Sequence, residues 1–202
     1  MKFVFSLLLL SFLSNLSLAF SHDDGAPIFD TNYWAIYPEA RYYIVPSFFG
    51  FRSGKLKLAK TGHSNCPVTV LEQDFTTDKG VPVQFSIIGS SYDILTGTPI
   101  FIEFTKKPDC VKSSKWLIFV DNVIKKSCVG IGGPENYPGM KILNGTFNIQ
   151  KLSGITYKFV FCDSGSKTFS DIGWYDNGEG EGRLVLADKN ISGYAFVEDV
   201  WV

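Results

Sequence analysis

Helix signals are what this 202-residue sequence has least of. No segment of about a dozen residues combines apolar positions at helical spacing with a capping residue at its start. The two histidines and four cysteines do not have the spacing of a zinc site, and no glycine-rich loop has the pattern that cradles a phosphate. We therefore expect little helix, no metal centre and no cofactor.

An excess of charge is also missing. The chain has 19 Lys and Arg against 20 Asp and Glu, a net charge of −1. Removal of an N-terminal leader that contains Lys2 would leave 18 basic against 20 acidic residues, a net charge of −2. This balance argues against binding to nucleic acid or to a charged membrane surface, both of which need clustered Lys and Arg.

The first residues have the pattern of a secretory signal peptide. Lys2 precedes an apolar run that ends in the small residues Ser17 and Ala19. Cleavage after Ala19 fits this pattern, with cleavage after Ser21 as an alternative and a retained membrane anchor as the weaker interpretation. We expect residues 1–19 to be removed, and residues 20–202 to form one domain, because no linker divides them.

A secretory route leads to an oxidising compartment, where cysteines pair and sequons can receive glycans. Four cysteines allow three pairings, and the residues concerned are Cys66, Cys110, Cys128 and Cys162. Two sequons outside the leader begin at Asn144 and Asn190, each beside a glycine in turn-like sequence.

From Tyr42 onward the chain alternates short runs of β-branched and aromatic residues with turn residues. This sequence pattern predicts strands, and several of the runs alternate apolar and polar residues, as half-buried strands do. Ten runs begin at Tyr42, Lys55, Val68, Val83, Ile100, Trp116, Thr146, Tyr157, Arg183 and Tyr194. So many short strands in one domain indicate a sandwich, a barrel or a trefoil, and the pattern does not choose among them.

A resemblance to a known family begins at Ile28. Ile28-Phe29-Asp30-Thr31-Asn32, followed by Ile36 and Tyr42-Tyr43-Ile44, resembles the N-terminal signature of the plant Kunitz-type (soybean trypsin inhibitor-like) inhibitors, with Tyr33 as a departure. Further motifs follow in the family's order: Asn65-Cys66-Pro67-Val68-Thr69-Val70, Gly80-Val81-Pro82-Val83, Cys110, Trp116, Gly130-Ile131-Gly132-Gly133, Tyr157-Lys158-Phe159-Val160-Phe161-Cys162, Asp171-Ile172-Gly173 and Arg183-Leu184-Val185. The resemblance implies an all-β fold, a β-trefoil of about twelve short strands in three similar units around a pseudo-threefold axis.

The same resemblance implies a disulfide between Cys66 and Cys110. This bridge would close a loop of about 45 residues and contribute roughly 4 kcal/mol on a chain-entropy estimate. Phe169 occupies the position of the partner that Cys162 has in the family, so the family's second bridge cannot form. Cys128 is an additional cysteine, and two alternatives stay open: a Cys128–Cys162 bridge, or two free thiols.

In the family, an exposed loop in the first third of the chain imitates a substrate and blocks a serine protease. The equivalent tip is Gly89, Ser90, Ser91, Tyr92 and Asp93, with Ser90 at the specificity position and Tyr92 there if the alignment shifts by two. Neither residue supplies the cation that a trypsin pocket requires. The family's bracing asparagine is replaced by Pro38, which has no side-chain hydrogen-bonding group.

Two residue patterns resemble catalytic or calcium-binding sites, and each has a simpler interpretation. Asp163-Ser164-Gly165, with His63 upstream, resembles a serine-protease set, but the chain lacks that fold and the triplet lies in a loop. The segment from Asp176 to Gly182 has neither the spacing of a calcium loop nor its flanking helices, and it fits a polar hairpin turn. We expect no catalytic residues.

The sequence thus predicts a secreted serine-type endopeptidase inhibitor that is not an enzyme and not directed at trypsin. Its expected partners are secreted or vacuolar proteases, and we expect a monomer that is extracellular (apoplastic) or vacuolar. The alternatives are a non-inhibitory trefoil with a defence, storage or carbohydrate-binding role and, less favoured, a glycosidase of the alpha-fucosidase kind.

Overall fold

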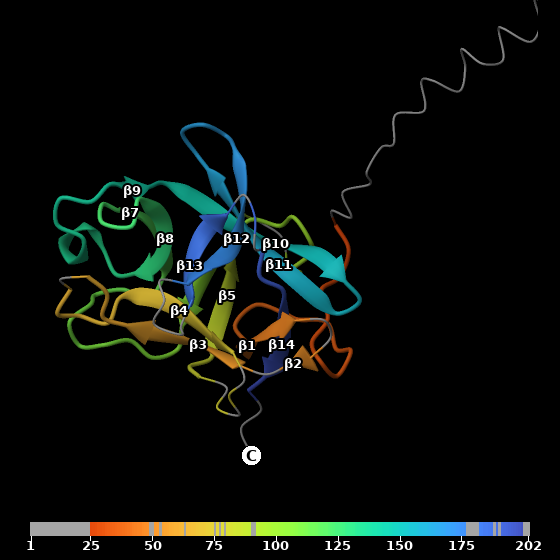
Figure 1. The fold of residues 1–202 in the computed structure, drawn as a ribbon. Helices are drawn as coiled ribbons and strands as arrows, with labels where there is room; N and C mark the ends of the chain where they lie inside the picture. Colours follow the sequence, from red (N-terminus) through yellow and green to blue (C-terminus); the bar gives the residue numbers. More distant parts are fainter. Residues whose placement is uncertain are drawn as a thin grey trace, which may run out of the picture.

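The computed structural model describes residues 25–48, 51–52, 54–62, 64–74, 76, 78, 80–89, 92–176, 182–187, 189 and 191–199. The predicted signal peptide, residues 1–19, and Phe20 lie outside this range. Across the described residues the chain forms fourteen strands and one 3-10 helix, η1 (Pro134–Asn136) (Figure 1). Within the same residues, no helix is long and apolar enough to cross a membrane.

The strands are β1 (Arg41–Phe48), β2 (Phe51–Arg52), β3 (Gly54–Ala59), β4 (Thr69–Asp74), β5 (Val83–Ile87), β6 (Ile100–Phe104), β7 (Trp116–Asp121), β8 (Lys126–Ile131), β9 (Ile142–Leu143), β10 (Gly145–Ser153), β11 (Thr156–Asp163), β12 (Phe169–Asp176), β13 (Gly182–Ala187) and β14 (Tyr194–Glu198).

Six of these strands close into an antiparallel barrel. The pairs are β1–β5, β5–β6, β6–β10, β10–β11, β11–β14 and β14–β1, so the last strand returns to the first. Closure leaves these six strands without a free edge, which is how an all-β domain avoids edge-to-edge association.

Three hairpins, β3–β4, β7–β8 and β12–β13, cap the barrel (Figure 1). Their second strands pair with one another, as β4–β8, β8–β13 and β13–β4. A buried ion pair joins two of the hairpins, with Arg183 Nη1 2.8 Å from Asp121 Oδ2. Each third of the chain thus supplies two barrel strands and one cap hairpin, which confirms the predicted β-trefoil.

Aromatic side chains fill the barrel. Phe159 is fully buried and lies 5.2 Å from Tyr194 and 6.0 Å from Phe196, measured between ring centroids. Phe85 packs edge-on against Phe196 at 5.6 Å. Each fully buried ring of this size stabilises the fold by roughly 1.5–3 kcal/mol, so the barrel interior is a main source of stability.

All ten predicted runs are strands, but the longer strands β8 and β12 were not predicted. Gly130 in β8 and Gly173 in β12 interrupt the β-branched pattern on which the prediction depends. At Gly130 a Cβ atom would lie 2.1 Å from the hydroxyl oxygen of Tyr137. That hydroxyl donates to the carbonyls of Val68 and Ile131, at 3.1 and 2.8 Å, so the glycine makes room for a buried hydrogen-bonding group.

Gly130→Ala is therefore expected to destabilise the protein by about 1–3 kcal/mol, the usual effect of overpacking a core. Urea denaturation measures the difference. Ser127→Ala, on the same strand but only partly buried, is the matched control and should change stability by less than about 0.5 kcal/mol. Equal stability of Gly130→Ala and the parent would contradict this packing role.

Candidate functional site

The predicted loop connects β5 to β6, two neighbouring barrel strands. These strands pair in antiparallel register from Val83 with Phe104 to Ile87 with Ile100. One residue further, the backbone N–H of Ile88 donates to the carbonyl of Pro99 at 3.0 Å. The loop Ile88–Pro99 is thus closed at its base by the barrel itself.

Tyr92 and Asp93, described residues of the loop tip, are exposed to solvent. Tyr92 is 91% exposed, the largest value among the exposed large hydrophobic residues of the described chain. Gly89 has φ 125°, a backbone conformation that favours glycine, and Asp93 is exposed. Ser90 and Ser91 lie outside the described residues.

The second leg of the loop is anchored from two sides. Ile94 is buried in the core, and the Thr96 backbone exchanges hydrogen bonds with Gly25 and Ala26, at 2.8 and 2.9 Å. Gly97 N–H donates to the carbonyl of Ile149 on β10 at 2.9 Å. The tip is therefore presented from a fixed base. No local sequence signal predicted these anchors, because they join segments about 50 to 70 residues apart.

Strand β5, which leads into the loop, runs beside the segment that contains Pro38. The N–H of Glu39 donates to the Phe85 carbonyl at 3.3 Å, and Gln84 Nε2 donates to the Glu39 carbonyl at 2.7 Å. This places Pro38 close in sequence to the contact with β5, where the family's bracing asparagine is expected. The proline ring offers no donor or acceptor of its own.

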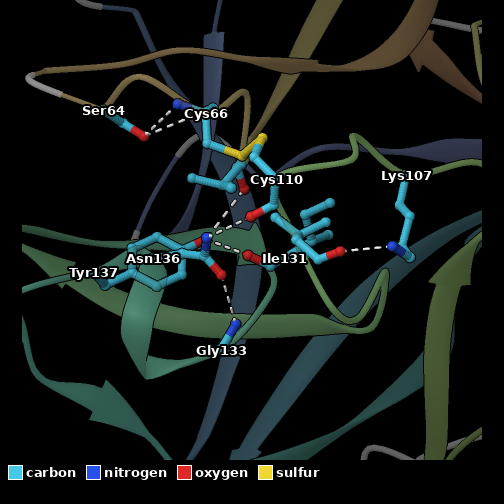
Figure 2. The surroundings of a disulfide bond; sticks show 10 residues. Ser64, Cys66, Lys107, Cys110, Ile131, Gly133, Asn136 and Tyr137 are labelled. Carbon is cyan, nitrogen blue, oxygen red and sulfur yellow. Dashed lines mark hydrogen bonds between the residues drawn. A yellow bond between two sulfur atoms is a disulfide. The ribbon is translucent and has the colours of Figure 1, made fainter.

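Cys66 and Cys110 form a disulfide, the pairing that the resemblance implies (Figure 2). The bridge joins the segment between β3 and β4 to the segment between β6 and β7. The Ser64 hydroxyl donates to the Cys66 carbonyl at 2.8 Å, and Asn136 Nδ2 donates to the Cys110 carbonyl at 3.3 Å. Side chains on both sides of the bridge thus fix its backbone.

Cys128 and Cys162 are free thiols, so the compensating bridge is not formed. Cys128 on β8 is fully buried, whereas Cys162 on β11 is partly exposed. Burial, and to a smaller degree the nearby Asp121 carboxylate, raise the pKa of the Cys128 thiol to about 12. Since the thiolate is the reactive form, Cys128 should be inert near neutral pH.

A thiol titration at pH 8 should therefore count one reactive cysteine in the native protein and two after denaturation without reductant. In Cys162→Ser the native count should fall to zero while the denatured count falls to one. A count of zero in the denatured parent protein would mean that the two cysteines are bridged.

The other candidates from the sequence lie next to the ends of strands or outside the described residues. Asp163 Oδ1 accepts the backbone N–H groups of Gly165 and Ser166, at 2.7 and 3.2 Å, which is the geometry of an aspartate turn rather than of a catalytic acid. Asp176, the last residue of β12, pairs with Gly182, the first of β13, and the residues between them, 177–181, lie outside the described residues. Asn144 is exposed, while Asn190 and His63 lie outside the described residues.

Comparison with known proteins identifies the family. The model of the legume Kunitz family, described as "Trypsin and protease inhibitor", matches residues 28–197. The chain belongs to this family. Kunitz relatives are protease inhibitors rather than enzymes, which agrees with the turn geometry of Asp163.

Three Kunitz proteins illustrate the similarity of this chain to the family in sequence and structure. A Kunitz-type trypsin inhibitor-like 2 protein of Pisum sativum is 51% identical over a matched region that spans 96% of this chain and 90% of the relative's own length. Subtilisin inhibitor CLSI-II of Canavalia lineata is 48% identical, over 83% of this chain and 90% of its own. The crystal structure of a Kunitz type trypsin inhibitor from Cicer arietinum has 52% identity and a TM-score of 0.81, and covers 87% of this chain and 99% of its own.

Proposed function

We propose that this Kunitz protein is a secreted serine-protease inhibitor whose loop tip, Gly89–Asp93, enters the active site of its target. The observation that carries the proposal is the loop Ile88–Pro99, closed at its base by a hydrogen bond and anchored through Thr96, with Tyr92 projecting at the tip. A preorganised loop binds tightly because it loses little conformational entropy on binding. Secretion follows in this proposal from residues 1–19 acting as a signal peptide, which leaves residues 20–202 as the mature protein.

The proposed targets are proteases with an aromatic or small specificity pocket. The tip contains no Lys or Arg, and a trypsin pocket left without a cation has an uncompensated buried carboxylate. Tyr92 suits an aromatic slot such as that of chymotrypsin or subtilisin, and Ser90 suits a small pocket such as that of elastase. The Canavalia relative, named a subtilisin inhibitor, supports the first of these.

Inhibition constants for subtilisin, chymotrypsin, elastase and trypsin would test the proposal. We expect tight inhibition of subtilisin or chymotrypsin and weak inhibition of trypsin. Tyr92→Ala should weaken the tight inhibition by about 30-fold, the effect of removing an aromatic hot spot worth about 2 kcal/mol. Leu152→Ala, an exposed apolar residue on β10, is the matched control and should leave inhibition unchanged.

Full activity of all four proteases at a slight inhibitor excess would contradict the proposal. The trefoil would then fit a defence, storage or carbohydrate-binding protein that has lost protease binding, as the replacement of the bracing asparagine by Pro38 would allow.

A further inference from the structure

A hollow of about 340 Å³ lies on the outer face of the barrel, where β10, β11 and β12 are neighbours. Its volume is within the range of about 300–1,000 Å³ that is typical of small-molecule sites. The register places Asn148 opposite Val160, and Val160 opposite Asp171, so three adjacent strands each contribute one residue to the same row. The lining residues are Gly97, Asn148, Gln150, Lys158, Val160, Phe169 and Asp171.

Asn148 is the unusual member of this lining. Its side chain sits on β10 with only 5% of the residue exposed, and among the described residues no group donates to its Oδ1 atom. A buried polar atom without a partner destabilises the folded state, so such atoms are rare in folded proteins. A hydroxyl group of a ligand in the hollow would supply the missing donor, and the amide N–H groups of Asn148 could donate to the same ligand.

The rest of the lining offers both donors and acceptors. Lys158 Nζ lies 2.8 Å from Asp171 Oδ1 and 3.0 Å from Oδ2, so the two charges neutralise each other. An ammonium group has three donors and a carboxylate about four acceptor positions, so both groups can bind a ligand while they remain paired. Gln150, which pairs with Lys158 in register, adds an amide.

Phe169 adds an apolar surface to this polar hollow. It begins β12 and is 66% exposed. The face of an aromatic ring carries partial negative charge, which attracts the weakly positive C–H groups of a sugar ring. Amides, a neutralised ion pair and an exposed ring together match a ligand that has hydroxyl groups on its edges and C–H groups on its faces.

We propose that this hollow binds a neutral saccharide of one or two units. The ion pair with Asp171 cancels the charge of Lys158, which argues against phosphate or another anion as the main ligand. An apolar ligand would leave Asn148 Oδ1 without a partner. The site is separate from the tip Gly89–Asp93, so its occupation does not depend on the inhibitory role proposed above.

Saturation-transfer NMR on the mature protein tests this proposal. The probes are glucose, galactose, mannose and N-acetylglucosamine, their β1–4-linked disaccharides, and a glycopeptide that ends in the sugar with the strongest signal. We expect at least one saccharide to bind with a millimolar dissociation constant. If the dissociation constant of the glycopeptide equals that of the free sugar, the ligand is the end of a protein glycan. If the glycopeptide binds more weakly, the ligand is a free sugar.

Two variants and one control locate the site. Phe169→Ala should weaken binding by about 2- to 12-fold, which corresponds to the loss of 0.5–1.5 kcal/mol of ring contact. Asn148→Leu should abolish binding while leaving the thermal midpoint unchanged or raised, because it removes the unpaired amide and keeps the branched shape of the side chain. Trp174→Ala removes another exposed ring of β12 that does not line the hollow, and it should leave binding unchanged.

No binding by any saccharide, or binding that phosphate displaces, would overturn the proposal. So would saccharide binding that Phe169→Ala leaves unaltered, and this exposed substitution remains informative even if Asn148→Leu fails to fold. Inhibition of proteases should be the same in all three variants, so a failure here is distinguishable from a failure of the inhibitor proposal.

Discussion

Replacement of both Cys66 and Cys110 by alanine is expected to lower the free energy of unfolding by about 4 kcal/mol. The bridge joins residues 44 apart in the sequence, and a cross-link of that span removes many conformations from the unfolded chain. It also connects the first and second thirds of the trefoil, from the connection within the β3–β4 hairpin to the segment that precedes the β7–β8 hairpin. Because a single domain is stable by only about 5–15 kcal/mol, this loss is a large share of the total.

The effect should be specific to the bridge. The hydrogen bonds from Ser64 to Cys66 and from Asn136 to Cys110 involve backbone carbonyls, so they can form in the variant as well. Cys162→Ser, which removes a partly exposed free thiol, is the control and should change stability by less than about 1 kcal/mol. Urea denaturation of the three proteins gives the comparison, and a loss below about 1 kcal/mol in the double variant would contradict the structural role of the bridge.

Ser90→Arg is expected to improve inhibition of trypsin by about 30- to 5,000-fold. An inhibitor that places no cation in the trypsin pocket loses about 2–5 kcal/mol of binding free energy, because the buried carboxylate of the pocket is left unpaired. An arginine at the specificity position restores the ion pair. Inhibition of subtilisin or chymotrypsin should weaken in the same variant if Ser90 is at the specificity position. Nanomolar inhibition of trypsin by the unmodified protein would instead show that the loop assignment is wrong, and Lys106 or Lys107 would become the candidate contact.

Pro38→Asn tests the brace independently of the pocket. Ser90→Arg alone should still be cleaved slowly by trypsin, and adding Pro38→Asn should slow that cleavage, because an ordered loop and a charged pocket contribute separately to binding. Gel analysis over hours, with both single variants and the pair, separates the two effects. A pair that does not bind trypsin at all would favour a non-inhibitory trefoil.

The strands of this protein could be predicted from local sequence, but their arrangement could not. Alternation of apolar and polar residues marks strands such as β5 and β6, because each has one buried face. Barrel closure depends on pairs such as Tyr42 with Glu198, which lie at opposite ends of the chain. Only the family resemblance selected the trefoil from the sandwich and the barrel.

The candidate loop could be located by sequence, whereas its supports could not. The family resemblance predicted the tip as Gly89–Asp93, but the hydrogen bonds between Thr96 and the segment at Gly25 depend on the fold. The same holds for the hollow beside Asn148, whose lining comes from three strands and the loop base. The state of Cys128 and Cys162 was left open because sequence contains no distance between them, and the structure has two free thiols.

Identification of the peptide bond that a bound protease cuts is the most direct test of the inhibitor proposal. Subtilisin and chymotrypsin would each be incubated with the protein for hours to days, and the fragments would be measured by intact-mass spectrometry after reduction. The proposal predicts one early cut, between Gly89 and Asp93, in a protein that still inhibits the protease. A first cut elsewhere, or inhibition that persists when Gly89–Asp93 is replaced by a glycine-rich segment of equal length, would contradict it.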